Sequence, residues 1–251
     1  SDLDGIYVDL DKYELTISRQ ENISSDSQDE IFVETNSSFV GLLRKNNDGV
    51  LVKSFQLKPS IEVQENGDKI LVIRANEPTG IIIPSKLAIN LKLCVEKDAN
   101  ISNLKTVSLN VKNANTTIAE NDFSITCENL TLSKESTTKS IATGNLTATK
   151  KMELNITSGR VDFSKAAKNT TDVTINTRAG NFEFANVKNI TVNSETNPYI
   201  KINENVYGYV EYYCKSGSLY AKNVMQNIAI NTDSAAIEFG SIYGTISATS
   251  Y

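Results

Sequence analysis

Acidic side chains at one recurring position come closest, in this sequence, to a catalytic arrangement. Asp162, Glu183 and Glu238 each stand between two apolar residues, so in a strand the three carboxylates would leave the face opposite to their neighbours. Two carboxylates held close together can hydrolyse a glycosidic bond. Tyr220 occupies the equivalent position between Glu183 and Glu238, and the other acids are scattered. The pattern therefore favours a solvated acidic face, with a groove for a cation or a cationic sugar as the alternative.

The residue inventory removes most other catalytic chemistries. The chain has no His, which excludes histidine triads, histidine-bound metals and imidazole bases. Its three cysteines, Cys94, Cys127 and Cys214, are too few and too far apart for a disulfide framework or a zinc site, so we interpret them as free, mostly buried thiols. Residues 2–5 (DLDG) contain two acids, a weak indication of a cation site, but the later ligands of a calcium loop do not follow. We therefore expect no catalytic residue, no metal site and no cofactor, and we do not expect an enzyme.

Tyrosines crowd into the chain from residue 199 onward. Tyrosine in a strand often serves only for packing, but an exposed ring can stack on a sugar or on a partner protein. Because side chains alternate strictly along a strand, Tyr212 should point into the core and Tyr213 should point outward. The residues that we predict to face a ligand are Tyr209, Tyr213 and Tyr220. Their ligand would be a host or bacterial surface protein or a glycan.

Charge and hydropathy bear on two further kinds of partner. The net charge is −5, whereas binding to nucleic acid needs a concentrated basic surface. No run of about 18 apolar residues is present to span a bilayer, so contact with a membrane would depend on an anchor outside this sequence. The chain starts at Ser1 without Met or an apolar leader. We interpret it as a mature ectodomain with an extracellular or cell-surface location.

An internal repeat defines the elements that must hold these side chains. One apolar residue recurs at intervals of 17 to 23 residues, and another follows two positions later. Repeats of this length are single structural units that stack on their neighbours, so we interpret each recurring residue as the start of one coil of a solenoid. The recurring residues are Val107, Leu130, Met152, Val173, Ile190, Val210, Ile228 and Ile246.

A bend divides each coil into two short strands. The coil that begins at Met152 shows the change. Before the bend its inward residues have even numbers, as Met152 and Leu154, and after the bend they have odd numbers, as Val161 and Phe163. A straight strand cannot change parity, because its side chains alternate strictly. One residue must leave the pleat, and glycine does so at little cost with a positive φ. The corner glycines for which we predict a positive φ are Gly159, Gly180 and Gly217.

The predicted fold is therefore all-β, a right-handed parallel β-solenoid. Equivalent strands of successive coils should lie about 4.8 Å apart, and parallel crossovers are almost always right-handed. An Asn recurs three residues after the first apolar residue, as at Asn155, Asn176 and Asn193. We interpret these residues as a ladder of stacked amides, with a ligand-reading stripe as the alternative.

The first third of the chain has a different pattern. Its short alternating runs are separated by turn signals at residues 47–49 and 66–68, which is typical of antiparallel hairpins. We therefore divide the chain into an N-terminal hairpin region, residues 1–84, and a solenoid region, residues 85–251. The hairpins would form a cap or a small sandwich, because bare strand edges invite pairing with other chains.

Three segments share one recognisable rung: residues 154–163 (LNITSGRVDF), 175–184 (INTRAGNFEF) and 212–220 (YYCKSGSLY). These rungs, with the proline-ended run IIIP at residues 81–84, resemble the putative-adhesin family of exported bacterial β-solenoid domains. The resemblance covers residues 81–251 and implies a solenoid with a surface location. It implies no catalytic residues, and the family has no agreed function.

Three classes of function remain, since a fold does not determine a function. A non-catalytic exported surface module, an adhesin or interaction domain, is favoured. The alternative is a structural or sensory component of the cell envelope that self-associates through its solenoid ends. A carbohydrate-active β-helix enzyme is the third class. Binding to glycans, formation of filaments and turnover of a polysaccharide would distinguish the three.

Overall fold

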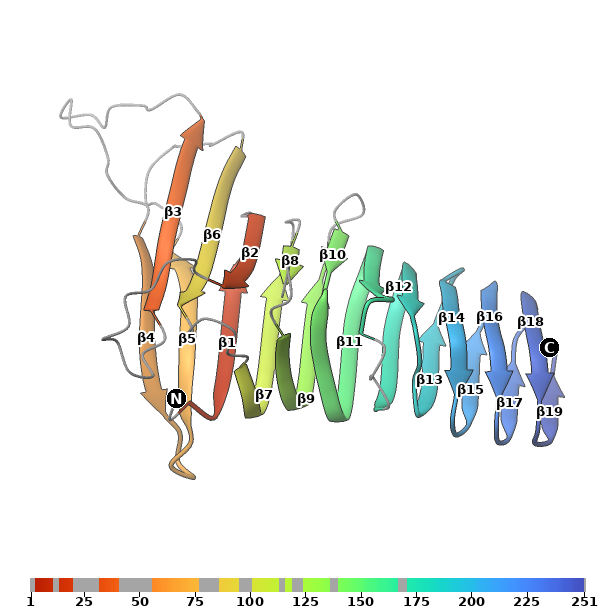
Figure 1. Cartoon of the computed structure of the whole chain (residues 1–251). Coiled ribbons are helices and arrows are strands. Elements are labelled where there is room, and N and C mark those ends of the chain that lie inside the picture. Colours follow the sequence, from red (N-terminus) through yellow and green to blue (C-terminus); the bar gives the residue numbers. More distant parts are fainter. Residues whose placement is uncertain are drawn as a thin grey trace.

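The computed structural model describes residues 3–10, 14–19, 32–40, 56–76, 86–94, 101–112, 116–118, 124–135, 140–166 and 171–250. In these residues every regular element is a β-strand, and the strands form one 19-stranded sheet that winds into an elongated solenoid (Figure 1). The described ranges contain no helix of the length and hydropathy that a membrane span requires. The all-β solenoid predicted from the repeat is confirmed.

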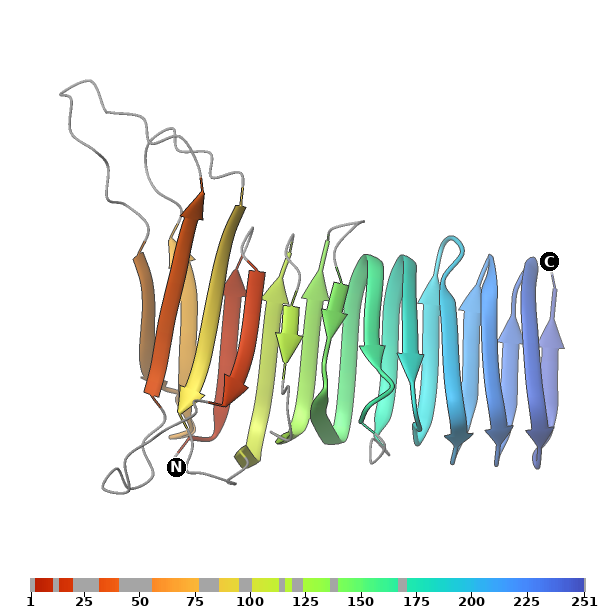
Figure 2. The same cartoon turned by 45° about the horizontal axis from the view of Figure 1, so that its top comes forward.

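Two ladders of parallel strands form the two sides of the coil (Figures 1 and 2). The first ladder contains β5 (Lys69–Asn76), β1 (Gly5–Leu10), β7 (Ile101–Val111), β9 (Ser124–Lys134), β11 (Asn145–Phe163), β12 (Asp172–Phe184), β13 (Asn189–Ser194), β15 (Val210–Cys214), β17 (Ile228–Asn231) and β19 (Ile246–Thr249). The second ladder contains β6 (Lys86–Cys94), β2 (Glu14–Arg19), β8 (Thr116–Ile118), β10 (Ser140–Ala142), the ends of β11 and β12, β14 (Tyr199–Val206), β16 (Ser216–Val224) and β18 (Ser234–Ile242).

The coil is right-handed, as predicted. In Figure 2 the nearer strands β14, β16 and β18 run downward and the more distant strands β15, β17 and β19 run upward, while the chain advances to the right. This sense of winding is the one that right-twisted strands favour in parallel crossovers.

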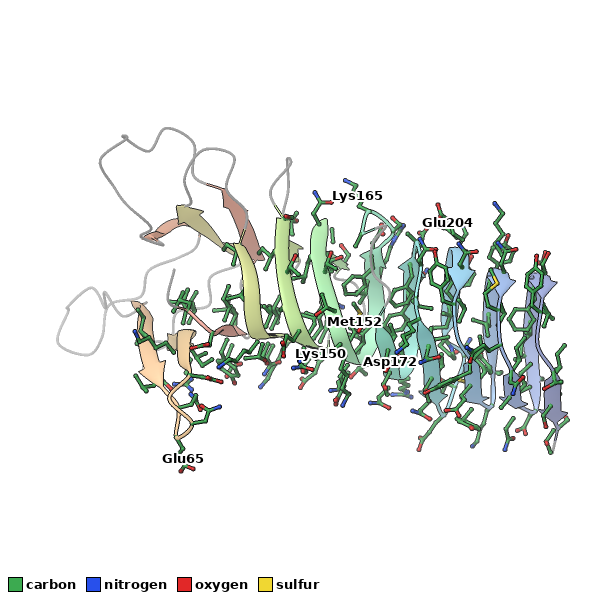
Figure 3. The ribbon with its side chains drawn as sticks, turned by 60° about the horizontal axis from the view of Figure 1, so that its bottom comes forward. Glu65, Lys150, Met152, Lys165, Asp172 and Glu204 are labelled. Atoms are coloured by element: carbon green, nitrogen blue, oxygen red, sulfur yellow. The ribbon has the colours of Figure 1, made fainter. Side chains whose placement is uncertain are left out.

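The apolar residues of the repeat form continuous columns inside the coil. Each of the eight recurring residues pairs with the next, from Val107 to Ile246. Two residues further on, a second column contains Leu154 and Ile175, which pair with each other and are fully buried. Side chains of both ladders, Met152 among them, fill the space between the strands (Figure 3). Removal of this apolar surface from water stabilises the fold by about 25 cal/mol per Å².

The N-terminal region matches the predicted hairpins only in part. β4 (Gln56–Val63) pairs antiparallel with β5 through the turn at Gly67, and β3 (Phe32–Val40) pairs antiparallel with β6. β1 and β2 do not form a hairpin: β1 is parallel to β5 and β7, and β2 is parallel to β6 and β8. The first two strands are therefore a coil of the solenoid, and the parallel stack begins well before residue 85.

The alternation in β1 explains why sequence alone placed it wrongly. Ile6, Val8 and Leu10 are all buried, and Ile6 and Val8 extend the two inner columns by pairing with Val107 and Leu109. A strand with one buried face has the same two-residue period in a hairpin and in a coil. Its partner is decided by tertiary pairing, here with residues about a hundred positions later.

Two of the three corner glycines have the predicted conformation. Gly159 has φ +94° and Gly217 has φ +107°, in the region that side chains with a Cβ rarely adopt. The prediction of a positive φ at Gly180 is wrong. There the backbone N–H donates a hydrogen bond of 2.8 Å to Thr177 Oγ1, and an added Cβ would lie 2.7 Å from that oxygen. Glycine is required at this corner by lack of space rather than by its φ.

The recurring asparagines form a hydrogen-bonded ladder on the outer face of the first ladder of strands. Asn176 Nδ2 donates to Asn155 Oδ1 at 2.9 Å, and Asn193 Nδ2 donates to Asn176 Oδ1 at 3.1 Å. This geometry supports the interpretation of the motif as a structural ladder, because each side-chain amide donates a hydrogen bond to the amide oxygen of the preceding coil. In the following coil the position opposite Asn193 is occupied by Tyr213.

Candidate functional site

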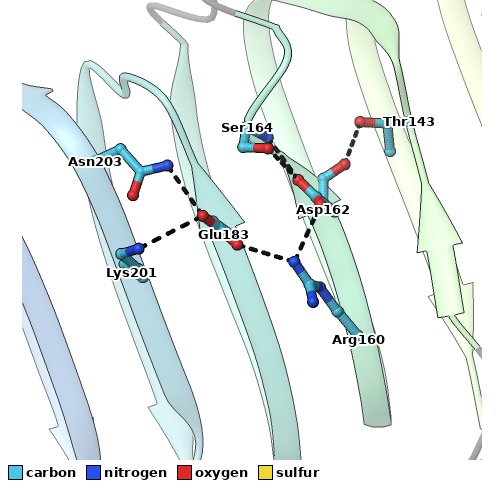
Figure 4. A network of polar contacts seen from close by, with 7 residues as sticks. All are labelled: Thr143, Arg160, Asp162, Ser164, Glu183, Lys201 and Asn203. Atoms are coloured by element: carbon cyan, nitrogen blue, oxygen red, sulfur yellow. Dashed lines mark hydrogen bonds and ion pairs between the residues drawn. The ribbon is translucent and has the colours of Figure 1, made fainter.

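Two residues of the acidic column, Asp162 and Glu183, lie on the outer face of the second ladder, within a network of polar contacts (Figure 4). Asp162 pairs with Glu183, and Glu183 pairs with Lys201. Arg160 Nη2 lies 3.3 Å from Asp162 Oδ2 and 3.0 Å from Glu183 Oε2. Asn203 Nδ2 donates to Glu183 Oε1 at 3.0 Å, and Lys201 Nζ lies 3.7 Å from the same oxygen. The two acids are thus held by cations and by the amide of Asn203.

Asp162 is stabilised as an anion. Burial raises the pKa of its carboxyl, but the hydroxyl and backbone N–H of Ser164 donate to Oδ1 at 2.6 and 2.9 Å, and Arg160 adds its positive charge. The result is a pKa below the ordinary value. A general acid in glycoside hydrolysis needs a raised pKa instead. Of the two interpretations of the acidic column, this arrangement favours a solvated structural face over a groove for a cation or a cationic sugar.

The three tyrosines predicted to face a ligand lie on different parts of the molecule. Tyr209, 38% exposed, directly precedes β15, and Tyr213, 42% exposed, lies near the end of that strand. Tyr220 is half-buried on β16, in the second ladder, between Lys201 and Glu238. Tyr209 and Tyr213 therefore share one side of the coil, whereas Tyr220 belongs to the other.

A shallow depression opens beside Tyr213, at the corner where β15 turns into β16. Its volume is about 450 Å³, and its lining residues are Ser194, Tyr213, Cys214, Lys215, Asn231, Thr232 and Asp233. We call it the Tyr213 pocket. The Lys215 carbonyl accepts hydrogen bonds from the Thr232 hydroxyl at 3.1 Å and from the Asp233 backbone N–H at 3.0 Å. The pocket thus places an aromatic ring among amide, hydroxyl, ammonium and carboxylate groups on a backbone that the next coil holds in place.

A second depression of about 360 Å³ lies at the same corner in earlier coils. Its lining residues are Asn155, Ile156, Thr157, Asn176, Thr177, Arg178 and Glu195. We call it the Arg178 pocket. Adjacent residues at the end of β13 line the two pockets: Ser194 lines the Tyr213 pocket and Glu195 lines the Arg178 pocket. Ser194 also donates to the Arg178 carbonyl oxygen at 2.9 Å.

Together the two pockets form one polar strip, which we call the corner track. It extends across the ends of β11, β12, β13, β15 and β17, a distance of about 19 Å at 4.8 Å per strand. The asparagine ladder leads along it toward the Tyr213 ring. This geometry provides an extended, open contact surface.

Tyr213 was predicted from the sequence, but the charged residues of the corner track were not. Arg178, Lys215 and Asp233 stand two residues before the corner position of their coils, which is Gly180, Gly217 or Ala235. Outward polar residues at a bend have no periodicity of their own, so the alternation that identifies the core does not single them out. Their constant offset from the corner is the signal that could have found them.

A buried lysine was also missed. Lys134 is 1% exposed, pairs with Ile156 across the coils, and its Nζ donates to the Ser158 carbonyl oxygen at 3.0 Å. Burial lowers the pKa of this ammonium group to about 8. The side chain ties β9 to the corner of the next coil, and its inward parity after Leu132 was visible in the sequence.

The described cysteines are free and buried, at Cys127 and Cys214, as predicted for both. Burial raises the pKa of Cys127 to about 12 and that of Cys214 to about 11, so neither thiol is poised as a nucleophile. The Cys94 side chain lies outside the described residues. In the part of the chain that the structure describes, no group of three or more acidic or cysteine side chains is arranged to hold a metal ion.

Comparison with known proteins gives structural neighbours only. No family model matches this chain, and no curated protein matches it. Among solved structures, a putative adhesin from Bacteroides fragilis is 14% identical with a TM-score of 0.47, over 99% of this chain and 93% of that one. A putative cell adhesion protein from Clostridium sporogenes is 11% identical with a TM-score of 0.33, over 99% and 94% of the two chains. A putative adhesin from Parabacteroides merdae is 13% identical with a TM-score of 0.28, over 99% and 92%.

Proposed function

We propose that this protein is a non-catalytic interaction module of the cell surface that binds an extended carbohydrate along the corner track. The observation that carries the proposal is the Tyr213 pocket, where a partly exposed ring stands beside Lys215, Asn231 and Asp233. An aromatic ring offers an apolar face to a sugar ring, and the surrounding groups can exchange hydrogen bonds with its hydroxyls.

The rigidity of the surface supports binding rather than turnover. Tyr213 is flanked by the fully buried Tyr212 and Cys214, and the Tyr212 hydroxyl donates to the Ser216 carbonyl oxygen at 3.0 Å across the corner. Because this backbone is held on both sides, little conformational entropy is lost when a ligand binds. The track is long and shallow, as expected for several weak contacts with a chain of sugars.

The acidic network supports the absence of hydrolysis. Glu183 and Asp162 each contact Arg160, and both lie in the second ladder, whereas the track lies at the end of the first. A retaining or inverting glycosidase would need two carboxyl groups across one substrate cleft. The corner track offers Glu195 and Asp233 in separate pockets.

An array of host and bacterial oligosaccharides tests the proposal. We expect binding to an extended oligosaccharide, followed by calorimetry with the bound compound and the Tyr213→Ala and Asp233→Asn variants. Each variant should weaken binding about tenfold or more, which corresponds to about 1.4 kcal/mol, without a change in melting temperature.

Two tyrosines outside the corner track provide matched controls. Tyr243 is 68% exposed and Tyr220 lies in the second ladder, so Tyr243→Ala and Tyr220→Ala should bind the same oligosaccharide as well as the unmodified chain. Loss of binding in Tyr220→Ala but not in Tyr213→Ala would place the contact surface on the other side of the coil. Binding to a protein but to no oligosaccharide would overturn the ligand class.

A further inference from the structure

Charged side chains of alternating sign follow one another along the corner track. They belong to one column that crosses successive coils, because the strands of the first ladder that precede them pair in register. In the last four coils of this column the charges are positive, negative, positive and negative, and we call these four residues, Arg178, Glu195, Lys215 and Asp233, the charge column. The whole column contains Lys112, Glu135, Thr157, Arg178, Glu195, Lys215 and Asp233.

The charge column is not paired internally. In the part of the chain that the structure describes, none of its four side chains forms an ion pair, whereas Arg160 and Lys201 in the second ladder both contact Glu183. All four side chains are exposed. Two of them line the Arg178 pocket and two line the Tyr213 pocket. The two hollows of the corner track therefore present one exposed cation and one exposed anion each.

The alternation of sign restricts which ligand can lie along the charge column. A purely anionic chain would meet Glu195 between Arg178 and Lys215, and a purely cationic chain would meet both of these cations, so each would bring like charges together. An uncharged chain would displace water from the charged groups and return no opposite charge. A chain that carries both signs in alternation can pair with every member of the column.

The rise of the solenoid suits a chain of sugars. Successive members of the charge column are about 4.8 Å apart along the axis of the coil, and one linked sugar extends a polysaccharide by a similar length. A polysaccharide that lies along the column therefore presents successive sugars to successive coils. Alternating sugars would meet alternating charges.

We propose that the ligand of the corner track is a zwitterionic polysaccharide, in which sugars with a carboxylate alternate with sugars with a free amino group. This inference rests on the proposed function and names the class of carbohydrate. The carboxylates pair with Arg178 and Lys215, and the ammonium groups pair with Glu195 and Asp233. Exposed ion pairs are individually weak and are screened by salt, so binding needs several pairs at once and weakens as the salt concentration rises.

A second copy of the chain would also carry alternating charges, but its shape does not fit. A two-fold axis could place Arg178 opposite Asp233 and Glu195 opposite Lys215. The same surface is hollowed in both copies, so two facing tracks would leave space between them, whereas stable protein interfaces are closely packed. A thin polymer can enter the hollows, which favours the polysaccharide.

Calorimetry with a matched series of hexasaccharides tests the class of ligand. The zwitterionic probe alternates glucuronate with glucosamine, and the anionic probe is the same compound with each amine acetylated. A hexamer of glucosamine is the cationic probe, and a hexamer of N-acetylglucosamine is the neutral probe. At low salt the zwitterionic probe should bind about tenfold more tightly than each of the others, and about 0.5 M salt should remove most of this advantage.

A change of sign within the charge column tests the role of its residues. Glu195→Lys makes the column cationic from Arg178 to Lys215, and should shift the preference about tenfold or more toward the anionic probe. Glu238→Lys is the matched control, because it makes the same change of charge at an exposed position of the second ladder; it should keep the preference of the unmodified chain. Glu195→Gln should weaken binding of the zwitterionic probe about threefold. The melting temperature of all three variants should be unchanged.

Several results would overturn this inference and leave the carbohydrate function intact. One is equal binding of the zwitterionic and neutral probes, and another is an array that yields only uncharged oligosaccharides. A shift of preference in Glu238→Lys as large as that in Glu195→Lys would also overturn it. Sedimentation without ligand adds a further check, since a dimer that Glu195→Lys dissociates would assign the charge column to a second copy. Binding to no probe and to no oligosaccharide of the array would overturn the proposed function as well.

Discussion

The central coils, around β11 and β12, and the last coil, β18 and β19, are built from the same repeat but have different surroundings. Met152 and Ile246 occupy the same column, yet Met152 is fully buried and Ile246 is half exposed. A coil has no interior of its own and becomes a core only when both neighbours are present. The difference shows that position in the stack, and not residue type, determines how much each apolar side chain stabilises the fold.

The outer faces of the two regions differ as well. The central coils carry Arg160, Asp162 and Glu183 in ion pairs, and the amides of Asn155 and Asn176 are joined by a hydrogen bond. The last coil has only Glu238 as a charged residue. The outer face of the central coils is therefore cross-linked by charge and amide contacts, whereas the outer face of the last coil carries one carboxylate.

The largest difference in stability should be between a core substitution in the central coils and one in the last coil. Leu154→Ala removes a fully buried side chain and should lower the free energy of unfolding by about 2–5 kcal/mol. Ile246→Ala should cost less than about 1 kcal/mol, because half of that side chain is already in water. Urea denaturation of both variants measures the difference, and equal losses would contradict the open terminal coil.

A pH dependence should come from the central coils. The pKa of Lys134 is about 8 in the folded chain and about 10.5 when unfolded. Between these values the unfolded chain binds more protons, so the free energy of unfolding should rise with pH from about 8 to 10.5, by at most about 3.5 kcal/mol at 1.4 kcal/mol per pKa unit. Denaturation at several pH values checks this rise.

Lys134→Met is the control for that pH dependence. It removes the titrating group and keeps a long apolar side chain in the column, so the rise above pH 8 should vanish. If the rise persists in the variant, another group causes it.

The corners should show a smaller effect. Gly217→Ala combines a positive φ with a Cβ 2.8 Å from Pro198 Cδ, and should destabilise the chain by about 1–3 kcal/mol. Gly67 has φ +86° but no atom within 4 Å of an added Cβ, so Gly67→Ala should cost about 1 kcal/mol, from backbone strain alone. Thermal unfolding of the pair separates strain from crowding, and a Gly67 variant as damaging as the Gly217 variant would remove the role of close approach.

The smallest effect should come from the asparagine ladder. Asn176→Ala breaks hydrogen bonds with both Asn155 and Asn193. It should cost about 1 kcal/mol in total, because these amides are exposed to water and each bond contributes about 0.5 kcal/mol. Among the described residues, Asn193→Ala removes only the bond with Asn176 and should cost about 0.5 kcal/mol. Chemical denaturation of the Asn176→Ala and Asn193→Ala variants compares them, and a larger loss for Asn193→Ala would contradict this order.

The sequence determined the columns and the period of the coil. Val107 through Ile246 were identified by spacing alone, and each pairs with the next in the structure. The inward position of Tyr212 followed from alternation in the same way. Such features can be predicted from sequence because side chains in an extended strand alternate with a strict two-residue period. Successive coils repeat this pattern at a near-constant interval.

Tertiary structure decided what the period leaves open. The partner of β1, the close approach of Pro198 to Gly217, and the gathering of Asp233 with Tyr213 and Lys215 all depend on segments that meet only when the coils stack. The same holds for the difference between Ile228 and Ile246, two isoleucines with the same local pattern. Local periodicity states which side of a strand is buried, but the neighbour that buries it is brought there by pairing between distant parts of the chain.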